Sequence, residues 1–223
     1  MRLTSSIARP VGATQNQVLR NTYALLALSL LPTIAGAWLG LATGMLQGLS
    51  PWVSAGLFLG VTFGLMYLIE RNKSSPSGVA WLLALTFFMG LMLSRTLGFV
   101  LSKSNGMELV VTAFGGTTAV FFAMAALSSV IKRDLSGLGQ VLFVGVILLL
   151  VASLANLFFQ SGPLMLTLAV LGAGIFSMFV LVDLKRVRDG YETNYISATL
   201  GVYLSLYNVF SSLLQILGLT ADD

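Results

Sequence analysis

The chain has no cysteine and no histidine among its 223 residues. Without cysteine it can form no disulfide and offers no thiolate nucleophile. Without histidine it can build neither a serine–histidine catalytic pair nor a histidine-ligated metal site. Charged residues make up only 9% of the sequence. These absences exclude most catalytic chemistry, so we expect a protein that is not an enzyme and that holds no metal or cofactor.

The few acidic residues argue against the remaining catalytic possibilities. An intramembrane aspartyl protease needs two carboxylates that share a site. Apart from Glu70 and Glu108 at the ends of apolar stretches, Asp183 is the only acidic residue near a membrane interior. The Gly115-Gly116-Thr117 triplet lies inside an apolar run, so it does not predict a phosphate-binding loop, and nothing else predicts a nucleic-acid partner.

What the sequence does contain is a series of long apolar runs. Hydrophobic residues make up 57% of the chain, and the mean hydropathy is +0.92. Each run approaches the roughly 20 residues that a helix needs to cross a bilayer. We therefore predict an all-α integral membrane protein with seven transmembrane helices. The expected segments are Thr22 to about Leu46, Pro51–Ile69, Gly78–Leu101, Met107–Ile131, Leu138–Phe159, Pro163–Val182 and Asn194–Leu219.

The distribution of lysine and arginine predicts the orientation of these segments. With seven spans, ten basic residues fall on one side and only Lys103 falls in a connection on the other, which is a strong positive-inside pattern. The domain organisation is then a cytoplasmic tail at 1–21, a transmembrane domain at 22–219 and a short periplasmic tail at 220–223. The ten residues are Arg2, Arg9, Arg20, Arg71, Lys73, Lys132, Arg133, Lys185, Arg186 and Arg188.

The last apolar segment differs from the other six because it carries a continuous polar stripe. At 3.6 residues per turn, the polar and small residues at steps of three or four fall on one face of the helix. Polar side chains avoid hydrocarbon, so the stripe must face other helices or a water-filled path. We expect this helix at the centre of the bundle. The polar stripe comprises Asn194, Ser197, Gly201, Ser205, Asn208, Ser212 and Gln215.

Small residues recur at every fourth position in two early segments, which is typical of closely packed membrane helices. These are Gly36, Gly40 and Gly44 in the first segment, and Gly56, Gly60 and Gly64 in the second. We expect the two segments to pack on each other as an antiparallel pair, in preference to forming a dimer face. Gly115, Ala119, Ala123 and Ala126 of the fourth segment predict a similar packing face.

Two charged residues have both an interfacial and a functional interpretation. Arg95 lies about 9 Å of helix from the outer end of its segment, so its side chain could reach the membrane surface or serve inside the bundle. Asp183 closes the sixth segment beside Lys185 and Arg186. The simpler interpretation is a carboxylate at the interface, paired within one helical turn.

Several sequence stretches resemble the Bax-inhibitor (transmembrane Bax inhibitor motif) family of membrane proteins. The stretches are Val18–Tyr23, Phe114–Phe122, Tyr191–Ile196 and Leu204–Phe210. The resemblance implies a seven-helix fold whose last helix is enclosed by the other six. For bacterial members it implies binding and restraint of FtsH, the membrane-anchored AAA+ protease of the inner membrane, with accessory membrane subunits as further candidate partners. It also implies slow degradation by that protease through the N-terminal tail, where Arg2 and Arg9 are the candidate grip residues.

Another branch of the same family resembles a pH-sensitive calcium leak, in which two carboxylates on the last two helices share a proton. The first carboxylate corresponds to Asp183, but the second corresponds to Ser205, so this pair is broken here. A lone carboxylate lacks the repulsion between like charges on which such a sensor depends. Asp183, Ser205 and Asn208 remain the candidates for a pore or pH sensor. Protease modulator is thus the first hypothesis, calcium or proton leak the second, and non-catalytic membrane scaffold the third.

Overall fold

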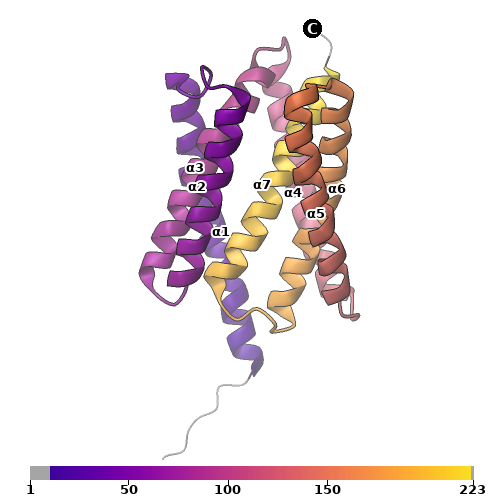
Figure 1. Cartoon of the computed structure of the whole chain (residues 1–223). Helices are drawn as coiled ribbons and strands as arrows, with labels where there is room; N and C mark the ends of the chain where they lie inside the picture. Colours follow the sequence, from indigo (N-terminus) through magenta and orange to yellow (C-terminus); the bar gives the residue numbers. More distant parts are fainter. Residues whose placement is uncertain (1–10, 222–223) are drawn as a thin grey trace, which may run out of the picture.

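The computed structural model describes the backbone of residues 11–221 and the side chains from residue 15 onward. Within that range the chain forms seven long helices that run up and down in alternation (Figure 1). All seven are long and apolar enough to cross a membrane. Arg2, Arg9 and the C-terminal Asp222-Asp223 lie outside the described residues. The helices are α1 Val11–Thr43, α2 Pro51–Asn72, α3 Pro76–Leu101, α4 Gly106–Val130, α5 Ser136–Phe159, α6 Gly162–Arg188 and α7 Tyr195–Thr220.

The predicted segments agree with the observed helices to within three residues, except at two ends. The first helix begins at Val11 rather than Thr22, and its first turns extend beyond the other helices (Figure 1). The sixth helix continues past Val182 to Arg188. Apolar content marks where a helix can lie in lipid, but a helix can extend into water, so hydropathy alone misses both extensions.

Local sequence explains several of the helix ends. Ser50 and Ser161 each accept a hydrogen bond at 3.3 Å from a backbone N–H in the first turn of α2 and α6. Proline stands at the start of both helices, where its missing N–H costs nothing. α6 ends before Gly190, whose φ of +81° is a left-handed conformation that suits glycine. Serine caps and a terminal glycine thus set where these helices start and stop.

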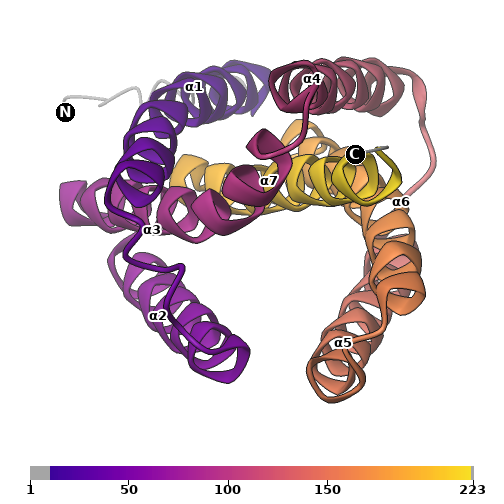
Figure 2. The ribbon, with the colours of Figure 1, turned by 90° about the horizontal axis from the view of Figure 1, so that it is seen from above.

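The last helix lies at the centre of the bundle, as the polar stripe predicts. Seen from above, α7 crosses the middle of the molecule, with the other helices arranged around it (Figure 2). It packs against α1, α2, α3, α4 and α6, while α5 packs against α6. No residue of α7 from 195 to 219 is exposed, whereas α5 has a single buried residue, Leu142. The seven-helix fold with a central last helix is confirmed.

Two hydrophobic clusters flank α7 at different heights in the bundle. The larger surrounds Ile196, Val202 and Tyr203 of α7 with buried leucines of α1, α3 and α6. The smaller surrounds Leu214 with residues of α1, α3 and α4. At the larger cluster the hydroxyl groups of Tyr203 and Thr33 form a hydrogen bond at 2.7 Å that joins α7 to α1. Burial along its whole length therefore holds α7 in place.

The closest helix pair is α1 with α3, and glycines make this approach possible. A Cβ on Gly90 of α3 would lie 2.8 Å from the carbonyl carbon of Thr33 and 3.0 Å from the amide nitrogen of Ala37. A Cβ on Gly36 of α1 would lie 3.0 Å from the amide nitrogen of Leu91. The glycines of α1 therefore serve close packing, but the expectation that their partner is α2 is wrong.

The small residues of α2 and α4 lie on the outside of the bundle. A Cβ added to Gly56, Gly60 or Gly64 would meet nothing within 4 Å, and all three glycines are exposed. The expected packing face of α4, from Gly115 to Ala126, is exposed as well. Both packing expectations are wrong for this chain. In α2, the buried residues include Thr62 and Ile69, on the side of the helix that packs against α3.

The connections α2–α3, α4–α5 and α6–α7 lie at one end of the bundle, together with the start of α1. This end carries Arg71, Lys73, Lys132, Arg133 and the basic last turn of α6. We call it the basic end. The opposite end holds the short connections that contain Ser50, Lys103 and Ser161, so the charge asymmetry expected from seven spans is reproduced in three dimensions.

Candidate functional site

The structure brings Asp183 of α6 and Ser205 of α7 into direct contact. The Ser205 hydroxyl donates a hydrogen bond to the Asp183 carboxylate at 3.1 Å. Ser205 is buried and Asp183 is half-buried. One turn before Ser205 stands Gly201, where an added Cβ would lie 3.3 Å from the Asp183 carboxylate carbon. The polar stripe thus contacts the Asp183 carboxylate through the Ser205 hydroxyl. At Gly201, the absence of a side chain leaves room for the same carboxylate.

Asp183 reaches this level because α6 does not end there. The helix continues for five more residues, through Lys185 and Arg186 to Arg188. Cations in the last turn suit the negative end of the helix dipole. The expectation that Asp183 closes the segment and pairs within one turn is wrong, since Lys185 instead forms an ion pair with Asp189 at 2.7 Å. Asp183 lies inside the bundle, and its hydrogen-bond donor is Ser205.

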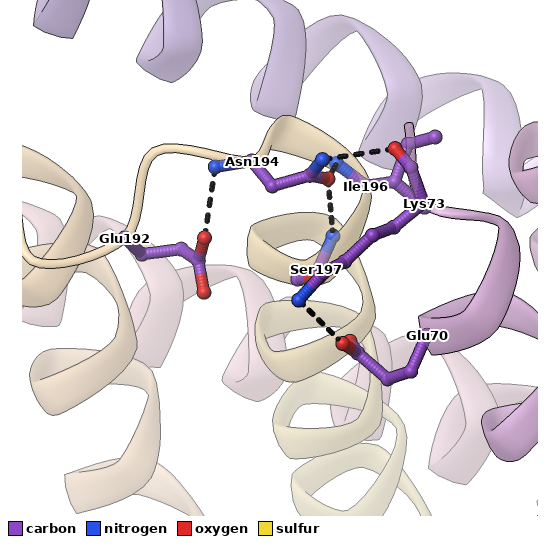
Figure 3. Close-up of polar contacts among 6 residues, drawn as sticks. All are labelled: Glu70, Lys73, Glu192, Asn194, Ile196 and Ser197. Atoms are coloured by element: carbon purple, nitrogen blue, oxygen red, sulfur yellow. Dashed lines mark hydrogen bonds and ion pairs between the residues drawn. The ribbon is translucent and has the colours of Figure 1, made fainter. Parts of the chain in front are cut away.

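At the basic end the stripe is anchored by Asn194, which caps α7. Its side-chain oxygen accepts hydrogen bonds from the backbone N–H groups of Ile196 and Ser197, at 2.9 and 3.2 Å. Its side-chain nitrogen donates to the Lys73 carbonyl at 2.8 Å, which ties α7 to the α2–α3 connection (Figure 3). Glu192 accepts a bond from the Asn194 backbone at 2.8 Å (Figure 3). This end of the stripe fixes the position of the central helix.

An exposed ion pair lies next to this anchor. Lys73 and Glu70 are 2.9 Å apart, and this hydrogen bond raises the pKa of the Lys73 ammonium (Figure 3). Both side chains are close to half exposed, so the pair adds little to stability. The pair joins the end of α2 to the first residue of the α2–α3 connection, whose carbonyl accepts the bond from Asn194.

The other half of the stripe bonds mainly within its own helix. The Asn208 amide donates to the Leu204 carbonyl at 2.8 Å, and the Gln215 amide donates to the Ser211 hydroxyl at 3.3 Å. Ser212 is buried beside Gly172 of α6, where an added Cβ would lie 2.9 Å from its hydroxyl oxygen. Among the described contacts, the side chains of Asn208 and Gln215 therefore form hydrogen bonds only within α7.

Arg95 bridges two helices near the opposite end. Its guanidinium donates a hydrogen bond to the Ser54 hydroxyl in the first turns of α2. The side chain is half-buried. The side chain thus reaches the first turns of a neighbouring helix, and the sequence offers no signal that would have named Ser54 as the partner.

A cavity of about 850 Å³ adjoins Asp183 on the basic side, between α5 and α6. One wall is apolar and includes Phe143, Val144 and Phe179. Its rim holds Asp134 and Asp189, which sequence reasoning missed because both stand in charged connections of ordinary composition. The Ser136 hydroxyl bonds to the Asp134 carboxylate and lowers its pKa, so Asp134 is ionised at neutral pH. The cavity therefore joins the Asp183 region to the basic end.

A seven-helix membrane bundle with a polar central helix, whose buried serine contacts one carboxylate, defines the class of this protein. The chain belongs to the Bax-inhibitor family. Residues 15–222 match the family described as inhibitor of apoptosis-promoting Bax1.

Relatives of similar length occur in several bacteria. The Escherichia coli K12 protein named modulator of FtsH protease YccA is 36% identical over 223 residues, which cover 99% of this chain and 98% of the relative. The same alignment statistics hold for the inner membrane protein YccA of Escherichia coli O6:H1. An uncharacterized membrane protein of Vibrio cholerae is 37% identical over 220 residues, with 99% and 96% covered.

Proposed function

We propose that this protein binds an FtsH-type AAA+ protease in the bacterial inner membrane and restrains it, and that it is itself a slow substrate of that protease. The observation that carries the proposal is the full-length similarity to the Escherichia coli protein named as a modulator of FtsH protease. Because the alignment covers both chains almost completely, the resemblance includes all seven helices rather than one shared segment.

The architecture supports restraint by slow unfolding. A protease that pulls on the chain must separate α1 from α3, where glycines let the backbones touch, and must also free α7 from five neighbouring helices. Kinetic resistance of this kind depends on the height of the unfolding barrier. While the protease is engaged with a bundle that resists extraction, it cannot degrade other substrates, and their degradation slows.

The proposed topology places the basic end in the cytoplasm, on the rule that lysine and arginine concentrate in cytoplasmic connections. The N-terminus is then cytoplasmic and the C-terminus periplasmic. Residues ahead of α1, including Arg2 and Arg9, are the proposed grip site. Accessory membrane subunits of the protease are proposed as additional contacts of the bundle surface.

The proposal is tested by measuring how fast the protease degrades another membrane substrate. We expect overproduction of this chain to lengthen the half-life of that substrate, and a membrane-permeable crosslinker to join the chain to the protease in native membranes. An unrelated seven-helix protein, produced at the same level, serves as the control for crowding of the membrane. An unchanged half-life together with no crosslinked complex would rule out the modulator role.

Contact between Asp183 and Ser205 favours a second candidate function, a cation leak. The calcium-leak branch of the family places two carboxylates where this chain has Asp183 and Ser205, and the 3.1 Å contact puts the two positions within bonding distance. The polar stripe continues beyond them along α7 through Asn208, and the cavity between α5 and α6 adjoins Asp183 at the basic end. A path for calcium ions or protons would follow these groups.

Substitutions at Ser205 separate the two candidate functions. We expect little pH-dependent calcium flux from the wild-type chain in liposomes, and a gain of pH dependence in Ser205→Asp, because two carboxylates in contact repel each other unless one is protonated. Ser211→Asp is the matched control, since it introduces the same group about 9 Å further along the helix. Strong calcium flux by the wild-type chain that is inhibited by acid would favour the cation leak over the protease modulator.

The leucine variants report on packing. Ser205→Leu removes the bond to Asp183 and should lower the free energy of unfolding by about 1–3 kcal/mol, measured as thermal stability in detergent. Asn208→Leu should lower the free energy of unfolding by less than Ser205→Leu does. Among the described contacts, the Asn208 amide forms a hydrogen bond only within its own helix. If the stripe lines an ion path, both variants should instead block flux while stability changes little.

A further inference from the structure

A second, shallower hollow of about 530 Å³ opens at the basic end, where the start of α1 meets the ends of α4 and α6. Side chains from three separated parts of the sequence meet there. The hollow lies on the far side of Lys185 from the cavity beside Asp183, and Lys185, Asp189 and Tyr191 line both. Its other polar lining residues are Gln15, Ser128, Ser129, Lys132 and Arg188.

The hollow has an excess of positive charge that the chain does not neutralise. Its one carboxylate, Asp189, is already bonded to Lys185 at 2.7 Å, and the Lys185 side chain is only 6% exposed. Lys132 and Arg188 are exposed and form no ion pair with any residue that the structure describes. Two cations therefore face the hollow with their charge available to a ligand.

Exposed apolar side chains lie on the last turn of α4, next to residues that line this charged hollow. Leu127 and Val130 are 43% and 73% exposed and adjoin the lining residues Ser128, Ser129 and Ile131 in sequence, although neither lines the hollow itself. Further into the bilayer, the rings of Tyr23 and Phe121 pack edge to face with centroids 6.0 Å apart and join α1 to α4. A ligand that extends from this hollow along the last turn of α4 would thus meet cations in the hollow and exposed apolar side chains beside it.

We propose that this hollow binds the phosphate headgroup of an anionic phospholipid, with Lys132 and Arg188 contacting the phosphate and the acyl chains lying along α4. Basic pockets between membrane helices are suited to such headgroups, and a charged donor bonded to phosphate is about twice as strong as a neutral one. The Gln15 amide adds a donor from α1. The bound lipid would link α1, α4 and α6 at the end where α1 extends furthest from the bundle.

The exposed apolar side chains beside the hollow favour a lipid over the other anions that could neutralise Lys132 and Arg188. Free phosphate would use the cations but would leave Leu127 and Val130 without a role. A soluble acidic peptide would have to approach side chains that lie next to hydrocarbon. Only an amphiphile matches both the charge and the exposed apolar surface, and this inference does not depend on whether the chain acts on a protease.

Native mass spectrometry of the full chain in detergent tests the site with palmitoyl-oleoyl phosphatidylglycerol as the anionic probe and the phosphatidylcholine of the same chains as the neutral one. We expect the phosphatidylglycerol dissociation constant to rise about tenfold or more in Lys132→Gln/Arg188→Gln. Arg71→Gln/Arg133→Gln is the matched control, because it removes the same charge from the basic end at residues that line neither hollow. Its affinity should stay close to that of the wild type.

Each remaining outcome decides for or against the site. An equal loss in the control pair would mean diffuse attraction to the basic end and would overturn the proposal. The proposal would also be overturned if inorganic phosphate or a polyglutamate peptide displaced the phosphatidylglycerol when added at a concentration equal to that of the lipid. Lys132→Arg/Arg188→Lys keeps the charge and should keep binding, so it tests the site even if the glutamine pair fails to fold, and loss of binding in this folded variant would contradict the assignment.

Discussion

Replacing Gly90 with alanine should lower the stability of the bundle more than any other single-methyl change in the chain. The new Cβ would lie 2.8 Å from the Thr33 carbonyl carbon and even closer to its oxygen, and both are backbone atoms that cannot rotate away. Relief requires α1 and α3 to move apart along a contact that also includes Gly36 and Gly40. Overpacking of this kind costs about 1–3 kcal/mol even where side chains can adjust, and Gly90→Leu should yield no folded protein.

The control for this prediction is Gly60→Ala on α2. Gly60 is a helical glycine like Gly90, but a Cβ there meets nothing within 4 Å. Alanine should therefore be neutral or slightly stabilising, in line with its better helix propensity. Thermal unfolding in detergent, followed by the fluorescence of the three tryptophans, compares the two variants. Equal midpoints for Gly90→Ala and wild type would show that α1 and α3 do not pack through Gly90.

Deleting residues 2–9 should prolong the lifetime of the protein several-fold in cells that contain the protease. The deletion removes Arg2 and Arg9, the proposed grip residues, and stops before α1 begins at Val11, so the described bundle is left intact. A pulse-chase measurement of half-life checks this result, together with a thermal midpoint that should not change. In cells without the protease, the two chains should disappear at the same rate.

Two controls show whether the effect belongs to this end of the chain. Removing Asp222-Asp223 shortens the other terminus and should leave the half-life unchanged. Arg2→Gln/Arg9→Gln keeps the length of the N-terminal segment but removes its charge, so it separates charge from length. If the 2–9 deletion is degraded as fast as the wild type, the protease grips the chain elsewhere.

The sequence predicted the parts of the fold that follow from hydropathy and periodicity. Seven apolar runs predicted seven helices, and the stripe from Asn194 to Gln215 predicted a central α7, because polar residues at helical spacing can avoid lipid only inside the bundle. Helix partners were harder to predict. The spacing of Gly36 and Gly40 shows that another backbone approaches, but not which one, and α3 rather than α2 fills that position.

The candidate site was predicted in composition but not in geometry. Asp183 and Ser205 were named together through family resemblance, yet hydropathy ended the sixth segment at Val182 and placed the carboxylate at the membrane surface. The charges of Lys185 and Arg186 suggested that the chain leaves the membrane at these residues. In the structure the helix continues through both, and Lys185 forms an ion pair with Asp189. Contacts between distant connections, such as the bond from Asn194 to Lys73, leave no periodic signal in a single sequence.

The position of α7 has a consequence for synthesis of the protein in the cell. The helix that contacts five others is also the last of the seven to leave the ribosome, and chains emerge at about 5–20 residues per second. For seconds, α1 to α6 stand in the membrane without the helix that fills their centre. The face of α1 that carries Thr33 and the face of α6 that carries Asp183 then lack their partners on α7, Tyr203 and Ser205. A chain truncated before Tyr195 would remain in that state permanently, so the core is complete only after α7 has been synthesised.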